Sequence, residues 1–105
     1  MNSKTLTLLG FASKAGKLSY GFDKALTSAK AKKAFLMVMS CDISEKSRKE
    51  MEFYADKYGV KTMALSDVSG QQLTGAVGKN CKALSVNDRQ FADSIYISGG
   101  NADGK

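Results

Sequence analysis

A cluster of glycines that ends in a lysine is the first candidate for a functional site in this chain, because the backbone of such a loop can bind the phosphates of a nucleotide. Gly70, Gly75 and the pair Gly78–Lys79 lie close together. A P-loop, however, requires Gly-x-x-x-x-Gly-Lys-Ser/Thr, and here Gly75 is followed by Ala76. The dinucleotide motif Gly-x-Gly-x-x-Gly is absent. We therefore expect these glycines to form turns and a helix end.

The two cysteines are the other candidates for chemistry. A phosphatase-type thiolate loop that starts at Cys41 would need arginine at position 47 to bind the phosphate bidentately, but the chain has Ser47 there and Arg48 next. We interpret Cys41 as a buried structural thiol. Cys81 has no base or metal ligand nearby in the sequence, and two cysteines without any histidine cannot complete a zinc site. The sequence therefore predicts no catalysis, no metal and no cofactor.

Positive charge is concentrated in the first half of the chain. Residues 1–49 contain ten Lys or Arg and three Asp or Glu, a balance of +7, whereas residues 50–105 contain six and seven. A localised positive field suits a polyanion better than a small substrate. The alternative is a solvated lysine face that serves solubility. The densest part of this charge is a group of six lysines: Lys14, Lys17, Lys24, Lys30, Lys32 and Lys33.

The spacing of apolar residues predicts the elements that must position these side chains. Helices are expected over 3–14 and 22–31 and after Asp42, Ser69 and Asn87, alternating with strands at 17–20, 34–39, 60–65 and 83–86. The run 34–39 is apolar throughout, which predicts a central strand covered on both faces. This order predicts an α/β fold, a three-layer α/β/α sandwich with a small four-stranded mixed or parallel sheet.

Polar residues and glycines predict where several helices begin and end. The segments Asp42–Glu45 and Ser69–Gln72 each have the N-cap and N3 residues of a capping box. The helices that begin at these two segments are expected to end at Gly59 and Gly78.

At 105 residues the chain is expected to form a single domain over 1–97. The remainder, 98–105, is poor in apolar residues, and we expect a disordered tail there. No apolar run approaches the roughly 20 residues that cross a bilayer, and the N-terminus lacks the features of a signal peptide. Together with the two isolated thiols, this predicts a cytoplasmic protein without a membrane partner.

A stretch near the N-terminus resembles the N-terminal motif of a known protein family. It runs from Leu9 to Gly21 and reads Leu-Gly-Phe-Ala-Ser-Lys-Ala-Gly-Lys-Leu-Ser-Tyr-Gly. It is similar to the bacterial YlxQ-type branch of the ribosomal protein L7Ae family, whose members bind RNA kink-turns. The resemblance continues through 34–39 and Asp42 and resumes at 73–79 and 87–92. It implies the same α/β/α sandwich and a structured RNA partner, in particular ribosomal RNA.

The resemblance implies an RNA-binding site at the start of the second helix. Archaeal and eukaryotic members begin this helix with Gly-x-Asn-Glu-x-x-Lys, and the Asn, Glu and Lys read guanine edges of tandem sheared G·A pairs. This chain has Gly21, followed by Asp23 for Asn, Lys24 for Glu and Thr27 for Lys. Glycine lets the backbone approach a phosphate at a helix N-terminus. Asp23 can accept from a guanine amino group and Lys24 can donate to a base edge or a phosphate. The replacements predict weaker guanine readout.

A second contact implied by the resemblance is the loop before the fourth helix, where aliphatic side chains of the relatives meet a flipped-out nucleotide. Here this loop is Ser66–Gly70, and Val68 is its apolar candidate. From the basic cluster and the motif we expect phosphate contacts from Lys14 and Lys17, and Tyr20 is a candidate for stacking on a base. The predicted RNA-binding residues are Lys14, Lys17, Tyr20, Gly21, Asp23, Lys24, Thr27, Asp42, Ser66, Val68, Ser69 and Gly70.

The sequence thus predicts a non-enzymatic, ribosome-associated RNA-binding protein that docks a basic helix start and a loop on bent or kink-turn-like RNA. One alternative is a protein-interaction module with ribosomal or translation-factor proteins as partners. Another is the substrate-binding domain of an RNA-modifying enzyme whose catalytic part is a separate chain.

Overall fold

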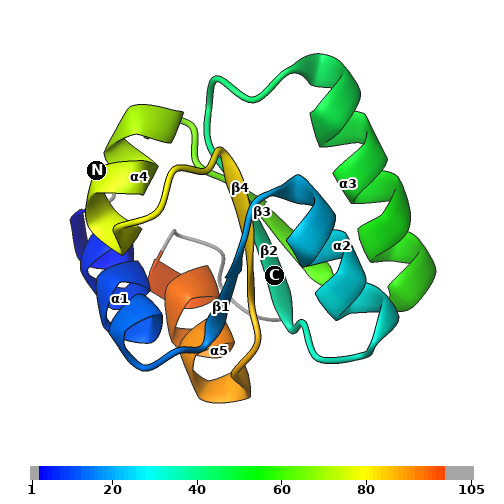
Figure 1. Ribbon diagram of the computed structural model, residues 1–105, viewed down its shortest axis with the longest axis horizontal. Coiled ribbons are helices and arrows are strands. Elements are labelled where there is room, and N and C mark those ends of the chain that lie inside the picture. Colours follow the sequence, from blue (N-terminus) through cyan, green and yellow to red (C-terminus); the bar gives the residue numbers. More distant parts are fainter. Residues whose placement is uncertain (1–2, 99–105) are drawn as a thin grey trace.

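One mixed sheet of four short strands lies at the centre of the molecule (Figure 1). The computed structural model describes residues 3–98 and builds the sheet from β1 (Leu18–Tyr20), β2 (Leu36–Met39), β3 (Lys61–Ala64) and β4 (Ala83–Val86). Their spatial order is β1-β4-β2-β3. Strand β4 is antiparallel to both of its neighbours, and β2 is parallel to β3.

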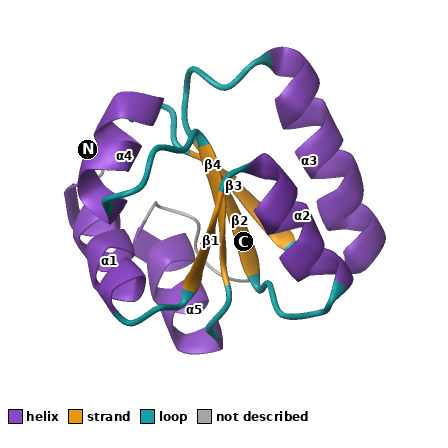
Figure 2. Ribbon diagram, in the orientation of Figure 1, coloured by secondary structure: helices purple, strands orange, loops and turns teal. Residues whose placement is uncertain are grey.

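Helices cover both faces of this sheet, so the predicted three-layer sandwich is confirmed (Figure 2). On one face lie α1 (Ser3–Lys14), α4 (Gly70–Val77) and α5 (Arg89–Ser98). On the other lie α2 (Phe22–Lys30) and α3 (Glu45–Tyr58). The tail predicted at 98–105 falls outside the described residues except for Ser98, which is the last residue of α5.

The continuous apolar run of β2 supplies both halves of the core. Leu36 and Val38 pack among the side chains of α1, α4 and α5, whereas Met37 and Met39 pack on the opposite face against α2 and α3. All four side chains are at most 1% exposed. Burying one side chain of this size contributes about 1.5–3 kcal/mol, so this strand holds the two helical layers together.

Most of the predicted helix ends agree with the structure. Ser69 and Gln72 form the predicted capping box of α4, and Gly59 and Gly78 take the left-handed conformation after α3 and α4. The capping box predicted for Asp42–Glu45 is wrong. The cap of α3 is Ser44, whose hydroxyl accepts the backbone N–H of Ser47 at 3.1 Å, because the Asp42 carboxylate has other partners.

The two cysteines differ in exposure. Cys81 is buried, and this burial raises the pKa of its thiol. The prediction that Cys41 is buried is wrong, because the chain turns away from the sheet at this residue and its backbone N–H donates to the Val68 carbonyl at 2.8 Å. Within residues 3–98, no three His, Cys, Asp or Glu side chains come together as metal ligands. None of the helices in this range is long and apolar enough to cross a membrane.

Candidate nucleic-acid interface

Four segments that are far apart in the sequence meet at one end of the sheet. The Gly21 N–H donates to the Ala83 carbonyl at 2.8 Å, which places the start of α2 beside the start of β4. The Ser40 N–H donates to the Lys82 carbonyl at 2.8 Å, which brings in the loop between β2 and α3. The Cys41 N–H bond to Val68 adds the loop between β3 and α4. We call this end of the sheet the Gly21 end.

The start of α2 is open at the Gly21 end. Gly21 precedes the helix with φ 95° and ψ 161°, and no side chain caps the helix there, in contrast with Ser44 on α3 and Ser69 on α4. The first-turn amides of a helix carry partial positive charge and attract anions. Lys24 is exposed on the same turn and adds a full charge. The start of α2 can therefore bind a phosphate.

Two other residues of α2 have their polar groups at this surface. Asp23 is exposed in the first turn, where its carboxylate opposes an incoming phosphate. Thr27 is exposed one turn later, and its hydroxyl donates to the Asp23 carbonyl at 3.0 Å. Because this bond uses the hydroxyl proton, the Thr27 oxygen is left to act as an acceptor.

Asp42 ties the two loops of the Gly21 end together. Its Oδ1 accepts the Ser40 hydroxyl at 2.7 Å and the Gly70 N–H at 2.8 Å. These hydrogen bonds, first that of Ser40 and then that of Gly70, favour the charged carboxylate and lower the pKa of Asp42 below its usual value. Gly70 is buried against Lys82, so the position of the Lys82 side chain depends on the same contact.

The lowered pKa of Asp42 predicts a loss of stability in acid. A carboxyl with a depressed folded-state pKa stabilises the fold above its unfolded pKa of about 3.9, and this contribution is lost as the pH falls through the folded-state value. As the pH falls from about 5 to about 2, the urea midpoint of the native chain should decrease. The decrease should be smaller for Asp42→Asn, which has no carboxyl at this position. Asp93→Asn, at an exposed position on α5, is the control. Identical pH profiles for the native chain and Asp42→Asn would contradict this role.

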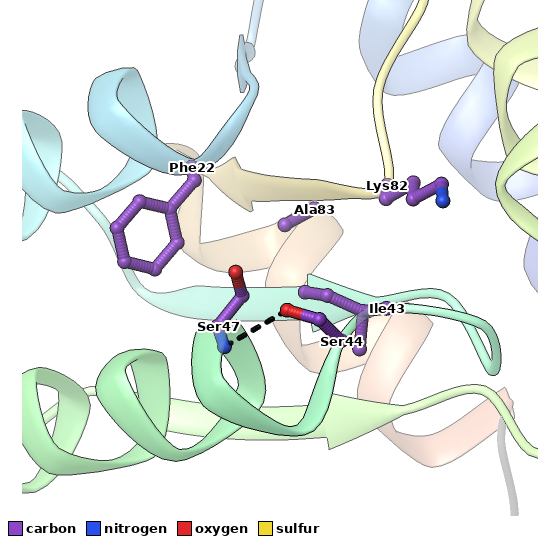
Figure 3. A pocket seen from close by; sticks show the side chains of 6 residues that line it. All are labelled: Phe22, Ile43, Ser44, Ser47, Lys82 and Ala83. Atoms are coloured by element: carbon purple, nitrogen blue, oxygen red, sulfur yellow. Dashed lines mark hydrogen bonds between the residues drawn. The ribbon is translucent and has the colours of Figure 1, made fainter.

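A cavity of about 230 Å³ opens between the starts of α2 and α3. Figure 3 shows the ring of Phe22 on one side and the Lys82 side chain on the other, with the start of α3 below them. Its wall is therefore part apolar and part polar, which suits a flat ring with polar edges. The residues that line it are Phe22, Ile43, Ser44, Ser47, Lys82 and Ala83.

Most of the predicted site residues come together at the Gly21 end. Gly21, Asp23, Lys24 and Thr27 share the first two turns of α2. Asp42 and Gly70 are joined by a hydrogen bond, and Ser66 and Ser69 belong to the loop that Gly70 ends.

One predicted contact is corrected by the burial of its side chain. Val68 is 2% exposed and packs in the core beneath α1, α4 and α5, so its side chain is not offered to a nucleotide. Tyr20 is partly buried against the same core, and its hydroxyl bonds to Ser13 Oγ at 2.6 Å. Ser13 in turn donates to the Val77 carbonyl at 2.6 Å, so Tyr20 links three elements, and its stacking on a base stays a prediction.

Lys14 and Lys17 do not lie at the Gly21 end. The Lys17 carbonyl accepts the Asn87 N–H at 2.7 Å, which places it beside the exit of β4, whereas Gly21 lies beside the entrance of β4. The three residues of β1 separate the two positions, a span of about 13 Å in extended chain. Lys14 ends α1 and leads into the same turn as Lys17. Lys14 and Lys17 are close to Gly21 in the sequence, but strand β1 lies between the lysines and the glycine and places them at opposite ends of the sheet.

Lys82, Phe22 and Ser44 were not predicted as site residues, yet all three line the cavity. Phe22 fitted the apolar stripe of its helix, and Ser44 fell inside the wrongly placed capping box. Lys82 stands immediately before the buried strand β4, and only the antiparallel pairing of β4 with β2 brings it beside Ser40. The positive charge of Lys82 is visible in the sequence, but the residues that surround it in the fold cannot be predicted from its local sequence.

Known proteins match this chain over most of its length. The model of the ribosomal protein L7Ae/L30e/S12e/Gadd45 family matches residues 3–96. The RNA-binding protein YlxQ of Enterococcus faecium is 29% identical over 89 residues, which cover 85% of this chain and 84% of that protein. Two solved structures share the fold. One is a protein of unknown function from Bacillus halodurans, with TM-score 0.86, 22% identity and coverage of 93% of this chain and 98% of its own. The other is the 15.5 kD RNA-binding protein of Giardia lamblia, with TM-score 0.74, 15% identity and coverage of 95% and 88%.

Proposed function

Because the chain belongs to the ribosomal protein L7Ae/L30e/S12e/Gadd45 family, we propose that it is a non-enzymatic RNA-binding protein whose Gly21 end docks on bent or kink-turn-like RNA. The observation that carries this proposal is the open start of α2, with Gly21 lacking a side-chain cap and Lys24 exposed beside it. The name of the relative from Enterococcus faecium supports RNA as the partner. Ribosomal RNA in the cytoplasm is the proposed setting.

In the proposed complex a phosphate of the bent strand binds the first-turn amides of α2. Glycine at position 21 has no side chain to block this approach. Lys24 is exposed in the first turn of α2 and Lys82 lines the cavity, and in the proposed complex both hold neighbouring phosphates. Phosphate contacts of this kind fix the position of the RNA and supply most of its salt-dependent affinity.

The cavity between α2 and α3 then receives an unstacked base from the bend. Phe22 and Ile43 offer apolar contact to the base, and Ser44 offers a hydroxyl to its edge. A base that is already displaced at a bulge or bend costs little to bind in this way, because its stacking has been lost. The loop Ser66–Gly70, held by Asp42, closes this side of the interface.

Guanine readout by α2 is expected to be weak. Asp23 accepts from a guanine amino group, but its charge opposes phosphates, and Thr27 presents an oxygen where the family's kink-turn binders have a lysine. The protein therefore recognises the shape of the RNA more than the identity of its base pairs.

The proposal predicts a charge-dependent affinity that is specific to one end of the sheet. Lys24→Gln combined with Lys82→Gln should weaken binding to a kink-turn RNA about tenfold or more, because two charge-assisted contacts are lost. The slope of log affinity against log salt should fall by about two units. Fluorescence titrations at several salt concentrations measure both quantities.

The matched control is Lys49→Gln combined with Lys57→Gln, hereafter the α3 control. These two lysines lie eight residues apart on the exposed side of α3, and the ion pair of Lys49 with Glu45 is solvent-exposed and worth little. The α3 control removes the same charge and should leave affinity nearly unchanged. Equal losses in the two double variants would mean that the field is diffuse and that the Gly21 end is not the site.

Exposed aromatic side chains favour a second candidate function, that of a protein-interaction module in a ribosome or translation-factor complex. Phe11 is 54% exposed and Phe53 is 63% exposed. Weak RNA affinity that does not respond to salt would favour this candidate over RNA binding.

A further inference from the structure

Basic side chains gather at the end of the sheet opposite to the Gly21 end. There the Asn87 N–H bonds to the Lys17 carbonyl at 2.7 Å, and the Phe35 N–H bonds to the Val86 carbonyl at 2.8 Å. The turns from α1 into β1, from α2 into β2 and from β4 into α5 therefore lie together, at the lower edge of Figure 1. We call this the Lys17 end, and its exposed basic residues are Lys14, Lys17, Lys30, Lys32, Lys33 and Arg89.

A partly buried hydrogen-bond network holds these three turns in place. Ser19 Oγ bonds to Ser28 Oγ at 2.7 Å and accepts Asn87 Nδ2 at 2.8 Å. The Asn87 Oδ1 accepts the Ser85 hydroxyl at 2.9 Å. The network thus connects β1, α2 and β4 close to the residues that carry the charges. The Lys17 end is consequently a fixed surface rather than a set of independent side chains.

Lys32 has a backbone conformation that points to a use for its side chain. After α1, α3 and α4, the left-handed position is occupied by Gly16, Gly59 and Gly78. After α2 it is occupied by Lys32, with φ 61°, and no other non-glycine residue within 3–98 has a positive φ. Glycine adopts this conformation more easily than lysine does. Keeping lysine there costs conformational energy, which is the kind of outlier from which function is inferred.

Helix dipoles do not account for this charge. A cation is favourable in the last turn of a helix, which explains only Lys14 on α1 and Lys30 on α2. Lys33 lies beyond the end of α2, and Arg89 is the first residue of α5, where a cation is unfavourable. None of the six basic side chains forms an ion pair with a carboxylate among residues 3–98. Their charge is therefore available to an external anion.

We propose that the Lys17 end is a second RNA-binding surface, which holds the sugar–phosphate backbone of an RNA duplex. Five of its six cations are lysines, and a lysine ammonium is a point charge that suits phosphate oxygens rather than base edges. The proposal rests on the proposed function in one respect, namely that a first RNA segment is bound at the Gly21 end. The protein then bridges two RNA segments that approach opposite ends of its sheet.

The test uses a short blunt RNA duplex with a donor dye and a kink-turn hairpin with an acceptor dye. The native chain should bind each RNA and should bring the two dyes together. Lys32→Gly combined with Lys33→Gln should weaken duplex binding about tenfold, lower its salt slope by about two units and abolish energy transfer. Hairpin affinity should stay within about twofold of the native value. The α3 control should leave duplex affinity, its salt slope, energy transfer and hairpin affinity unchanged.

The variant also separates binding from folding, because Lys32→Gly relieves a left-handed lysine and should keep or raise the thermal midpoint. Unchanged duplex affinity in a folded variant would overturn the proposal, as would a native chain that binds the hairpin but no duplex. If the native chain binds the duplex in a variant-sensitive way but does not bind the hairpin, the second surface stands and the proposed function fails.

Discussion

Gly21→Ala is expected to lower the free energy of unfolding by about 1–3 kcal/mol, because φ 95° with ψ 161° is a region that only glycine adopts readily. No atom lies within 4 Å of the position that a Cβ would take, so the cost is conformational rather than a clash. In the proposed complex the added methyl group would also crowd the phosphate that approaches Gly21. We therefore expect binding to a kink-turn RNA to weaken at least tenfold, at a temperature where the variant is fully folded.

Gly59→Ala is the matched control for this prediction. Gly59 also has a positive φ, 72°, and nothing lies within 4 Å of its Cβ position, but it ends α3 away from the Gly21 end. The control should lower the thermal midpoint by several degrees, since about 1 kcal/mol corresponds to roughly 4–8 °C in a domain of this size. Its RNA affinity should be native. A folded Gly21→Ala with native affinity would rule out docking at the start of α2.

Gly70→Ala is the second substitution with a large expected effect. A Cβ at this buried position would lie 2.6 Å from Lys82 Cγ and 3.4 Å from Asp42 Oδ1. Lys82 would have to move, whereas the approach to Asp42 is an ordinary contact. Overpacking of this kind costs about 1–3 kcal/mol. Because Lys82 lines the proposed base cavity, RNA affinity should fall about tenfold with it.

Gly75→Ala, in the same helix, should have the opposite effect on stability. Nothing lies within 4 Å of its Cβ position, and alanine is favoured over glycine inside a helix by about 0.5–1 kcal/mol.

Combining Gly70→Ala with Lys82→Ala removes the Lys82 Cγ with which the new Cβ would clash. The double variant should therefore recover part of the lost stability, but not the RNA affinity. Strictly additive changes in urea unfolding would show that the two residues are not coupled in this way.

The elements of this fold could be predicted from local sequence because their signals are local. The spacing of apolar residues predicts the helix 3–14 and the strand 83–86 with the bounds that the structure has. The capping box of Ser69 and Gln72 needs only a serine and a glutamine three residues apart. The left-handed ends at Gly59 and Gly78 need only a residue without a side chain.

The candidate site could be predicted only in part, because its neighbours are set by strand pairing. Nothing local indicates that β4 inserts between β1 and β2, which brings Lys82 to Ser40 and carries Lys17 away from Gly21. Asp42 matched a local cap, but the Gly70 N–H, from 28 residues further along the chain, competes for its carboxylate. Val68 looked exposed in a polar loop, whereas its side chain anchors that loop in the core.

The insertion of β4 has a consequence for how the protein is made. Strands β1 and β2 are not neighbours of each other, and the strand that joins them, β4, is synthesised some 45 residues after β2. A nascent chain that ends before residue 82 can therefore form α2 but lacks the backbone partners of Gly21 and Ser40. The contacts that assemble both ends of the sheet therefore form late in translation. Under the proposed function, the chain would acquire its RNA-binding surfaces only after β4 has emerged from the ribosome that synthesises it.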